Sequence, residues 1–229
     1  MKYVRSVAYT LATMLLYLGL PLLGWGINDL FGFFSSGPRA GYAVLIAIFA
    51  LAVGVQSVGD PQGIRGGEGE AGKLVIRQRL VRVGLILILY LVLVFLPYAD
   101  RRSIGILEVS RGVRWIGLFF SGIGLGLVFW SGVALGRMYS QDVTIQKDHR
   151  LVTNGPYRYI RHPRYLGVMV TAAGISLLFR SWLGLTLSFL VTLILYLRIR
   201  DEEAVLLREF GQEWEDYCQS SWRLLPYLY

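Results

Sequence analysis

Residues 151–167 read LVTNGPYRYIRHPRYLG, a polar and cationic stretch between two of the most apolar parts of the chain. Arginines, tyrosines and His162 alternate along it. A loop this rich in hydrogen-bonding groups, held between apolar segments, is a candidate functional site. Arginine and tyrosine belts also anchor membrane proteins at the bilayer surface, so the composition of this loop alone leaves both interpretations open.

The local sequence predicts how this loop is built. Gly155-Pro156 is a turn signal, because Gly tolerates positive φ and Pro fixes its own φ. Pro163 suits the first turn of a helix, and the residue before a proline is kept out of the helical region. His162 is therefore expected at a helix N-terminus, where free N–H groups favour an anion.

Apolar segments dominate the rest of the sequence. The chain has 229 residues, of which 55% are hydrophobic and 17% charged, with a mean hydropathy of +0.52. A helix needs roughly 20 residues to cross a bilayer. Apolar stretches of about this length lie near 7–27, 40–58, 82–99, 113–136, 164–180 and 182–199. The sequence therefore predicts an all-α integral membrane protein with about six transmembrane helices.

The last two apolar stretches are separated only by Arg180-Ser181, which predicts a tight C-terminal helical hairpin with a short first arm. Beyond the hairpin, apolar positions recur at helical spacing from Glu202 to about Tyr217, with charged residues on the opposite face. This pattern predicts a cytoplasmic amphipathic C-terminal helix, with Gly211 as a candidate break.

Small residues mark two further regions. In the fourth apolar stretch they lie at Gly117, Ser121, Gly122, Gly124, Gly126, Ser131, Gly132 and Gly136. Such a pattern lets two membrane helices pack closely. The glycines within 66–72 lack the spacing of a phosphate-binding loop, and we interpret that region as a linker.

Basic residues fall mainly on one side of a six-span topology: at the N-terminus, near 59–82, near 137–164 and in the C-terminal tail. The positive-inside rule then places both termini and the 151–167 loop in the cytoplasm. This distribution accounts for the net charge of +8 without nucleic acid, because the basic residues form no single stripe. The apolar run that follows Lys2 and Arg5 is interpreted as a retained first span.

The few cysteines and histidines restrict the chemistry. A single cysteine, Cys218, excludes an intramolecular disulfide. Only two histidines, His149 and His162, argue against a metal centre, and no metal is expected.

Arg198 and Glu202 are four residues apart, on one face at the end of the last span. An ordinary exposed ion pair would explain this spacing. A hairpin, however, brings its two ends together, so His162, Tyr165 and Glu202 are expected in one pocket. That convergence favours an active site over a membrane anchor.

An ordered set of motifs carries a family resemblance. The pattern L-V-x-x-G-x-Y-x-x-x-R-H-P-x-Y-x-G at 151–167 is followed by Glu202-Glu203, Phe210-Gly211, Tyr217 and R-x-x-P at 223–226. This set resembles the isoprenylcysteine carboxyl methyltransferase family. Related phospholipid methyltransferases share the R-H-P-x-Y-x-G and E-E parts. The resemblance divides the chain into residues 1–112, spans without a recognisable motif, and residues 113–229, a methyltransferase core.

The resemblance implies an integral-membrane methyltransferase that uses S-adenosylmethionine and a lipophilic acceptor from the bilayer, typically an isoprenylcysteine-like carboxylate. The motif positions imply that the cofactor pocket is formed by His149, Arg150, Leu151, Val152, Tyr157, His162, Pro163, Tyr165 and Glu202. They associate Arg198 with the acceptor, so Arg198 and Glu202 are the expected catalytic residues. Arg164 departs from the family pattern, in which smaller or apolar residues are frequent at that position.

Three other functions remain open at the level of the sequence. A phospholipid amine acceptor would need a general base, a role that suits Glu202 or Glu203. A membrane reductase of the sterol-reductase kind, which uses NADPH, is broadly similar in its C-terminal architecture. A non-catalytic membrane scaffold would bind neither cofactor.

Overall fold

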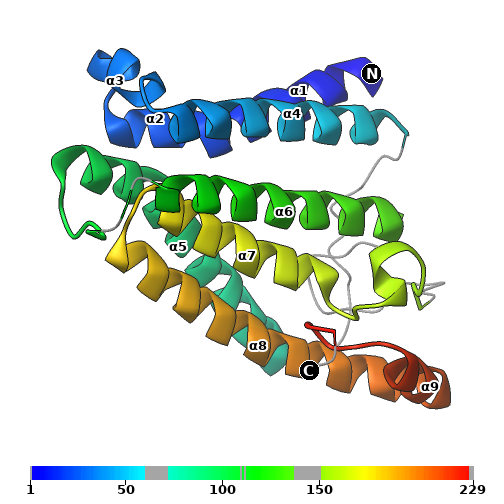
Figure 1. Ribbon diagram of the computed structural model, residues 1–229. Coiled ribbons are helices and arrows are strands. Elements are labelled where there is room, and N and C mark those ends of the chain that lie inside the picture. Colours follow the sequence, from blue (N-terminus) through cyan, green and yellow to red (C-terminus); the bar gives the residue numbers. More distant parts are fainter. Residues whose placement is uncertain (1, 60–71, 109, 111, 137–150, 227–229) are drawn as a thin grey trace.

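The computed structural model describes residues 2–59, 72–108, 110, 112–136 and 151–226, and these residues form helices joined by short connections (Figure 1). The elements are α1 (Lys2–Met14), the π-helical turn η1 (Leu15–Gly19), α2 (Leu20–Trp25), the 3-10 turn η2 (Ile27–Asp29), α3 (Leu30–Phe34), α4 (Gly37–Gly59), α5 (Gly72–Arg102), α6 (Gly112–Leu135), the 3-10 turn η4 (Gly155–Arg158), α7 (Pro163–Leu178), α8 (Trp182–Phe210) and α9 (Gln212–Ser220). Within these ranges the β pairing amounts to two isolated bridges. The predicted all-α class is therefore confirmed for the described residues. Most of the proposed glycine linker lies outside them.

Within the described residues, five helical stretches are long and apolar enough to cross a membrane. They are Lys2–Trp25, Gly37–Val58, Val81–Arg102, Gly112–Leu135 and Trp182–Phe210. The sixth predicted span is α7, which has 16 residues. A helix of that length extends about 24 Å, less than the roughly 30 Å of a bilayer's hydrocarbon core. The protein is thus a multi-pass membrane protein with five candidate spans, and α7 is the short arm of the hairpin.

The hairpin lies against the earlier spans (Figure 1). The most extensive contacts join α6 with α7, α1 with α4, α2 with α5 and α7 with α8. Figure 1 shows α1 and α4 side by side at one edge, α6 and α7 adjacent in the middle, and α8 beyond α7. Buried side chains from both halves of the chain, among them Tyr42, Leu93 and Phe179, form one core that fixes the hairpin to the N-terminal spans.

Glycines bring the backbones of α6 and α7 into direct contact. A Cβ atom added at Gly124 would lie 2.3 Å from Oγ1 of Thr171 and 2.6 Å from the carbonyl oxygen of Gly167. Non-bonded atoms do not approach so closely, so only glycine fits there. At Gly126, two residues along the same helix, nothing lies within 4 Å of an added Cβ. The packing role predicted for the small residues is therefore confirmed for one face of α6.

A buried charge cluster lies at the end of α7 that is remote from the 151–167 loop. Asp100, whose side chain has 0% exposure, contacts Arg39 at 3.1 Å, Arg114 at 2.7 Å and Arg180 at 3.5 Å. Arg39 and Arg114 also donate hydrogen bonds to backbone carbonyl groups. The positive-inside rule counts these three arginines as loop charges. In the structure, all three pair with the buried carboxylate of Asp100. The cluster ties α4, α5, α6 and the hairpin turn together.

The C-terminal helix is interrupted where the sequence indicated. Helix α8 ends at Phe210, and Gly211 has a φ of 50°, a left-handed conformation that glycine adopts without strain. Helix α9 then turns back, burying Trp214 and Tyr217. The amphipathic segment is therefore two helices, and α9 carries the chain towards the 151–167 loop.

Candidate active site

The 151–167 loop pairs with the segment that follows α9. The backbone N–H of Arg161 donates to the carbonyl of Trp222 at 2.7 Å, and the N–H of His162 donates to that of Arg223 at 3.2 Å. The N–H of Trp222 returns a hydrogen bond to the carbonyl of Tyr159 at 2.9 Å. The R-H-P part of the 151–167 motif and the C-terminal R-x-x-P motif are therefore neighbours in space.

His162 immediately precedes α7, as predicted, with φ −124° and ψ 55°. Its side chain is buried, and Nε2 lies 3.2 Å from Oε1 of Glu203. Its ring also stacks on Tyr165, with 5.7 Å between the ring centroids. An anion does lie beside this helix start, and it is the protein's own carboxylate.

Glu203 joins three parts of the chain. Besides His162, its carboxylate contacts Arg161 at 3.3 Å and Arg223 at 2.6 Å, and only 11% of the Glu203 side chain is exposed. The guanidinium of Arg161 also donates to the carbonyl groups of Cys218 and Ser221. Helix α8, the loop and the C-terminal segment are thus held together by one carboxylate.

Glu202, the neighbouring carboxylate, faces a different set of groups. Its Oε2 accepts a hydrogen bond from the hydroxyl of Tyr165 at 2.6 Å. The same hydroxyl accepts a hydrogen bond from Nε of Arg198 at 2.9 Å. Arg198, Tyr165 and Glu202 therefore form a continuous chain that joins the start of α7 to α8. Tyr165 contacts both His162 and Glu202, so the three residues converge as predicted, but of the three only Tyr165 lines the cavity, and a pocket shared by all of them stays a prediction.

A cavity of about 420 Å³ opens beside this chain. Its lining comes from η1 and α4 to α8: Tyr17, Phe49, Arg82, Leu85, Ile86, Ile88, Leu89, Val92, Leu125, Val128, Arg164, Tyr165, Val168, Thr171, Ala172, Ile175, Val191, Leu195 and Arg198. Aliphatic side chains dominate this lining. A volume of this size suits a small ligand with a hydrophobic body.

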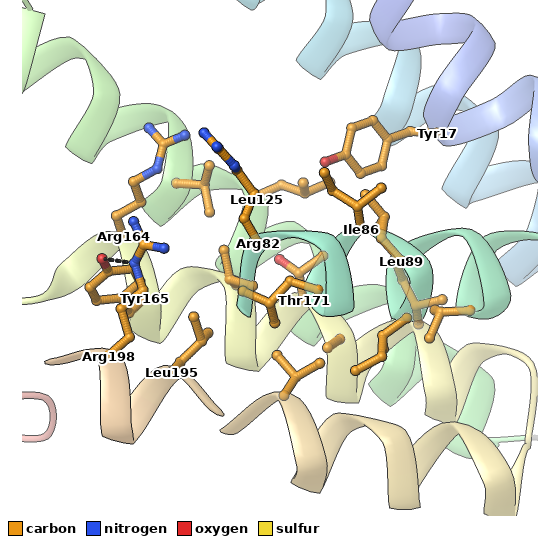
Figure 2. Close-up of a pocket in the computed structure, with 18 of the residues that line it drawn as sticks. Tyr17, Arg82, Ile86, Leu89, Leu125, Arg164, Tyr165, Thr171, Leu195 and Arg198 are labelled. Atoms are coloured by element: carbon orange, nitrogen blue, oxygen red, sulfur yellow. Dashed lines mark hydrogen bonds between the residues drawn. The ribbon is translucent and has the colours of Figure 1, made fainter. Parts of the chain in front are cut away.

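The polar groups of the cavity gather at its loop end. Figure 2 shows the side chains of Arg82, Arg164 and Arg198 on the same side of the cavity as Tyr165, with the hydrogen bond between Arg198 and Tyr165 drawn. Three guanidinium groups therefore lie at this end. The cavity therefore matches an amphiphile whose anionic end lies at the arginines and whose apolar body extends between the helices.

Two buried tyrosines, one in the loop and one in α9, join these two segments by a hydrogen bond. The hydroxyl of Tyr217 donates to the carbonyl of Tyr157, and both residues are less than a tenth exposed. Burial raises the pKa of Tyr217 to about 12, with Arg161 opposing the shift. Burial likewise raises the pKa of Tyr157. Both phenols therefore stay neutral at physiological pH and act as hydrogen-bonding groups.

The remaining predicted cofactor residues are distributed unevenly. Leu151 and Val152 are half-buried in the segment before η4, and Pro163 is completely buried in the first turn of α7. His149 and Arg150 lie outside the described residues, so their assignment stays a prediction. In the described part of the chain, no group of three or more His, Cys, Asp or Glu side chains forms a candidate metal site.

Sequence reasoning missed three residues of this region. Glu203 is expected from the sequence as a neighbour of Glu202 or as a general base, whereas in the structure it pairs with Arg161 and Arg223 of the flanking motifs. Arg82 and Tyr17 come from spans without a motif, yet both line the cavity. No local pattern indicates them, because only the packing of helices brings them to the site.

The residues present fit S-adenosylmethionine, which carries a sulfonium, an ammonium and a carboxylate. Glu202 is half-buried, and among the described residues its Oε1 has no hydrogen-bond partner. Such an oxygen suits a cationic or hydroxyl-bearing group. The ring of Tyr165 lies next to it, stacked on His162 and with the guanidinium carbon of Arg198 6.0 Å from its centroid.

Comparison with known proteins adds to this geometry. Residues 115–208 match the family described as "Isoprenylcysteine carboxyl methyltransferase (ICMT) family". A probable protein-S-isoprenylcysteine O-methyltransferase of Oryza sativa subsp. indica is 32% identical over 120 residues, which cover 51% of this chain and 62% of the relative. A protein-S-isoprenylcysteine O-methyltransferase of Schizosaccharomyces pombe is 39% identical over 89 residues, 37% of each chain. A solved structure of a eukaryotic intramembrane Ras methyltransferase ICMT aligns over 99% of this chain and 95% of its own, with 18% identity and a TM-score of 0.49.

The fold and the site define a class: a multi-pass helical membrane protein whose short hairpin forms one wall of an apolar cavity with arginines at one end. Within that class, the region 115–208, which contains α7, most of α8 and every residue of the Arg198–Tyr165–Glu202 chain, matches the isoprenylcysteine carboxyl methyltransferase family. The family resemblance read from the motifs is confirmed for this region. The matched segment spans about three fifths of the rice relative's length.

Proposed function

We propose that this protein is an S-adenosylmethionine-dependent methyltransferase that esterifies a carboxylate on a lipophilic acceptor taken from the bilayer. The observation that carries this proposal is the hydroxyl of Tyr165, which joins Arg198 to Glu202 at the charged end of an apolar cavity. Arg198, expected to bind the acceptor, and Glu202, expected to bind the cofactor, are thus both hydrogen-bonded to the hydroxyl oxygen of Tyr165.

The cofactor side consists of Leu151, Val152, His162, Tyr165 and Glu202, with His149 and Arg150 expected nearby. When bound, S-adenosylmethionine supplies an electrophilic methyl group. Glu202 binds a cationic or hydroxyl group of the cofactor, and Tyr165 packs against it. His162 acts through its stacking on Tyr165, which sets the orientation of that ring.

The acceptor side consists of Arg198, Arg164 and Arg82 above the aliphatic walls. A carboxylate is ionised at neutral pH, so it attacks without a general base. A guanidinium pairs with such a group in a fixed orientation. Because the methyl group transferred is cationic in character and the nucleophile anionic, charge is cancelled in the transition state, and a dry, preorganised cavity accelerates the step chiefly by alignment.

The location of the site follows the same proposal. The basic connections and both termini lie on the cytoplasmic side by the positive-inside rule. The charged end of the cavity then faces the cytoplasm, where a water-soluble cofactor enters, and the aliphatic walls lie within the bilayer.

The test is incubation of the purified protein with methyl-labelled S-adenosylmethionine and a membrane lipid extract, followed by identification of the labelled lipid. A base-labile methyl ester is expected. Label on an amine of a phospholipid would instead support the phospholipid N-methyltransferase alternative, with Glu202 as a candidate base.

Two variants separate the roles of the site. Glu202→Gln is expected to weaken binding of S-adenosylhomocysteine, whereas Arg198→Ala is expected to retain that binding and to lose methyl transfer. Glu209→Gln and Arg200→Ala, at exposed positions of the same helix, serve as matched controls. Wild-type rates in both site variants would contradict the assignment.

The reductase and scaffold alternatives are tested by titration calorimetry. The methyltransferase proposal requires binding of S-adenosylhomocysteine. Binding of NADPH in its place would support a reductase, and binding of neither would support a scaffold.

A further inference from the structure

The cavity also carries a polar group on the wall formed by the first span. Tyr17 lies in the second half of the first span, and Figure 2 shows its hydroxyl pointing into the cavity from the side opposite Tyr165, within reach of the electrostatic influence of Arg164. Among the described residues this hydroxyl has no hydrogen-bond partner. Tyr17 is half-buried, and its hydroxyl faces the open space of the cavity, where a bound ligand can reach it.

The backbone around Tyr17 is unusual in a way that fixes its position. Tyr17 lies in the middle of η1, a π-helical turn inserted between α1 and α2. Turns of this kind occur mostly as single insertions in helices, frequently at functional sites. The buried hydroxyl of Tyr42 donates to the carbonyl of Tyr17 at 2.6 Å, which stabilises the altered turn.

The ring of Tyr17 is held as firmly as its backbone. It packs edge-on against Phe49, another residue of the cavity wall, with 6.2 Å between ring centroids. The two other hydroxyls in the lining already donate hydrogen bonds, that of Thr171 to the carbonyl of Gly167 at 2.8 Å and that of Tyr165 to Glu202 at 2.6 Å. Tyr17 is therefore the lining hydroxyl whose hydrogen remains for a ligand.

We propose that Tyr17 is a specificity-determining residue, which donates a hydrogen bond to an oxygen at the far end of the acceptor. The acceptor is then an acid with two polar ends: a carboxylate at the arginines and a hydroxyl or carbonyl oxygen at Tyr17, joined by an apolar chain. The methylation of this ligand rests on the proposed function, whereas its binding in the cavity does not.

The aliphatic wall between the two ends makes recognition depend on chain length. Each methylene buried there strengthens binding by about 0.8 kcal/mol, roughly fourfold, until the chain fills the cavity. The distal oxygen contributes only when the chain is long enough to reach Tyr17. A ligand too short leaves its own hydroxyl among apolar side chains, which weakens binding.

The experiment compares decanoic, dodecanoic and tetradecanoic acids with their ω-hydroxy counterparts, using calorimetry on the detergent-solubilised protein. At one of these lengths we expect the hydroxy acid to bind about two- to tenfold more tightly than the plain acid, the range of one net hydrogen bond. Tyr17→Phe is expected to abolish or invert this preference and to leave the affinity for the plain acid unchanged. Tyr90→Phe, which removes a hydroxyl from an exposed position of α5, is the matched control.

The outcomes are separable. A plain acid preferred at every chain length, or an unchanged preference in Tyr17→Phe, would overturn the role of Tyr17. Because the Tyr17 hydroxyl has no partner among the described residues, the thermal midpoint of ligand-free Tyr17→Phe is expected to equal that of the wild type. Methyl-ester formation is measured separately. Selective binding of the hydroxy acid without methylation would support the role of Tyr17 and contradict the proposed function. Methylation without such selectivity would support the proposed function and contradict the role of Tyr17.

Discussion

Glu203 and Glu202 are adjacent in the sequence and do different things in the structure. Glu203 neutralises two arginines and contacts His162, whereas Glu202 faces Tyr165 next to the cavity. Consecutive residues of a helix point about 100° apart, so Glu203 contacts the loop and the C-terminal segment, whereas Glu202 contacts Tyr165, which lines the cavity. The sequence shows that both carboxylates are present, and only their partners assign the roles.

Glu203→Gln is expected to destabilise the protein by about 3 kcal/mol, because removing one partner of a buried ion pair leaves the other charges uncompensated. Thermal unfolding in detergent measures this loss. The loop and the C-terminal segment should become more accessible to proteases, since Glu203 joins them. Glu209→Gln, at an exposed position, should change the stability by less than about 0.5 kcal/mol.

At the scale of elements, the contact between α6 and α7 determines where Tyr165 lies. Gly124 and Gly167 face each other across it, and the backbones approach too closely for any side chain at Gly124. Helix α7 begins two residues before Tyr165. A shift of α7 against α6 therefore moves the hydroxyl that joins Arg198 to Glu202.

Gly124→Ala is expected to cost about 1–3 kcal/mol through overpacking and to lower methyl transfer more than S-adenosylhomocysteine binding. Gly126→Ala, on the same helix with open space around it, is the control and should be neutral or more stable by up to about 1 kcal/mol. Unfolding midpoints and methylation rates of the two variants provide the comparison. Equal behaviour of the two alanines would contradict the close-packing argument.

At the scale of the molecule, two polar centres lie at opposite ends of α7. One is the loop with its carboxylates, and the other is Asp100 with Arg39, Arg114 and Arg180. The second centre joins spans from both parts of the chain. The cavity likewise takes its lining from both parts, with Tyr17, Phe49 and Arg82 on one side of the predicted boundary at residue 112 and α6 to α8 on the other. The division of the chain at this residue stays a prediction.

Asp100→Asn is expected to be among the most damaging substitutions, at roughly 3–5 kcal/mol, because it leaves three buried or half-buried arginines without a counter-charge. The measurement is the yield of monodisperse protein together with its thermal midpoint. Asp216→Asn, at an exposed position of α9, is the control. Wild-type stability in Asp100→Asn would show that the arginines find other partners.

The sequence by itself determined the membrane class, the hairpin, the helix start at Pro163 and the break at Gly211, because hydropathy, proline and glycine act locally. It also determined the family resemblance, since the motifs are read in order along the chain. Tertiary structure alone decided that Glu203 holds the loop, that Arg82 and Tyr17 line the cavity, and that Asp100 gathers arginines from separate connections. Those contacts join residues far apart in sequence, and they exist only because helix packing brings particular faces together.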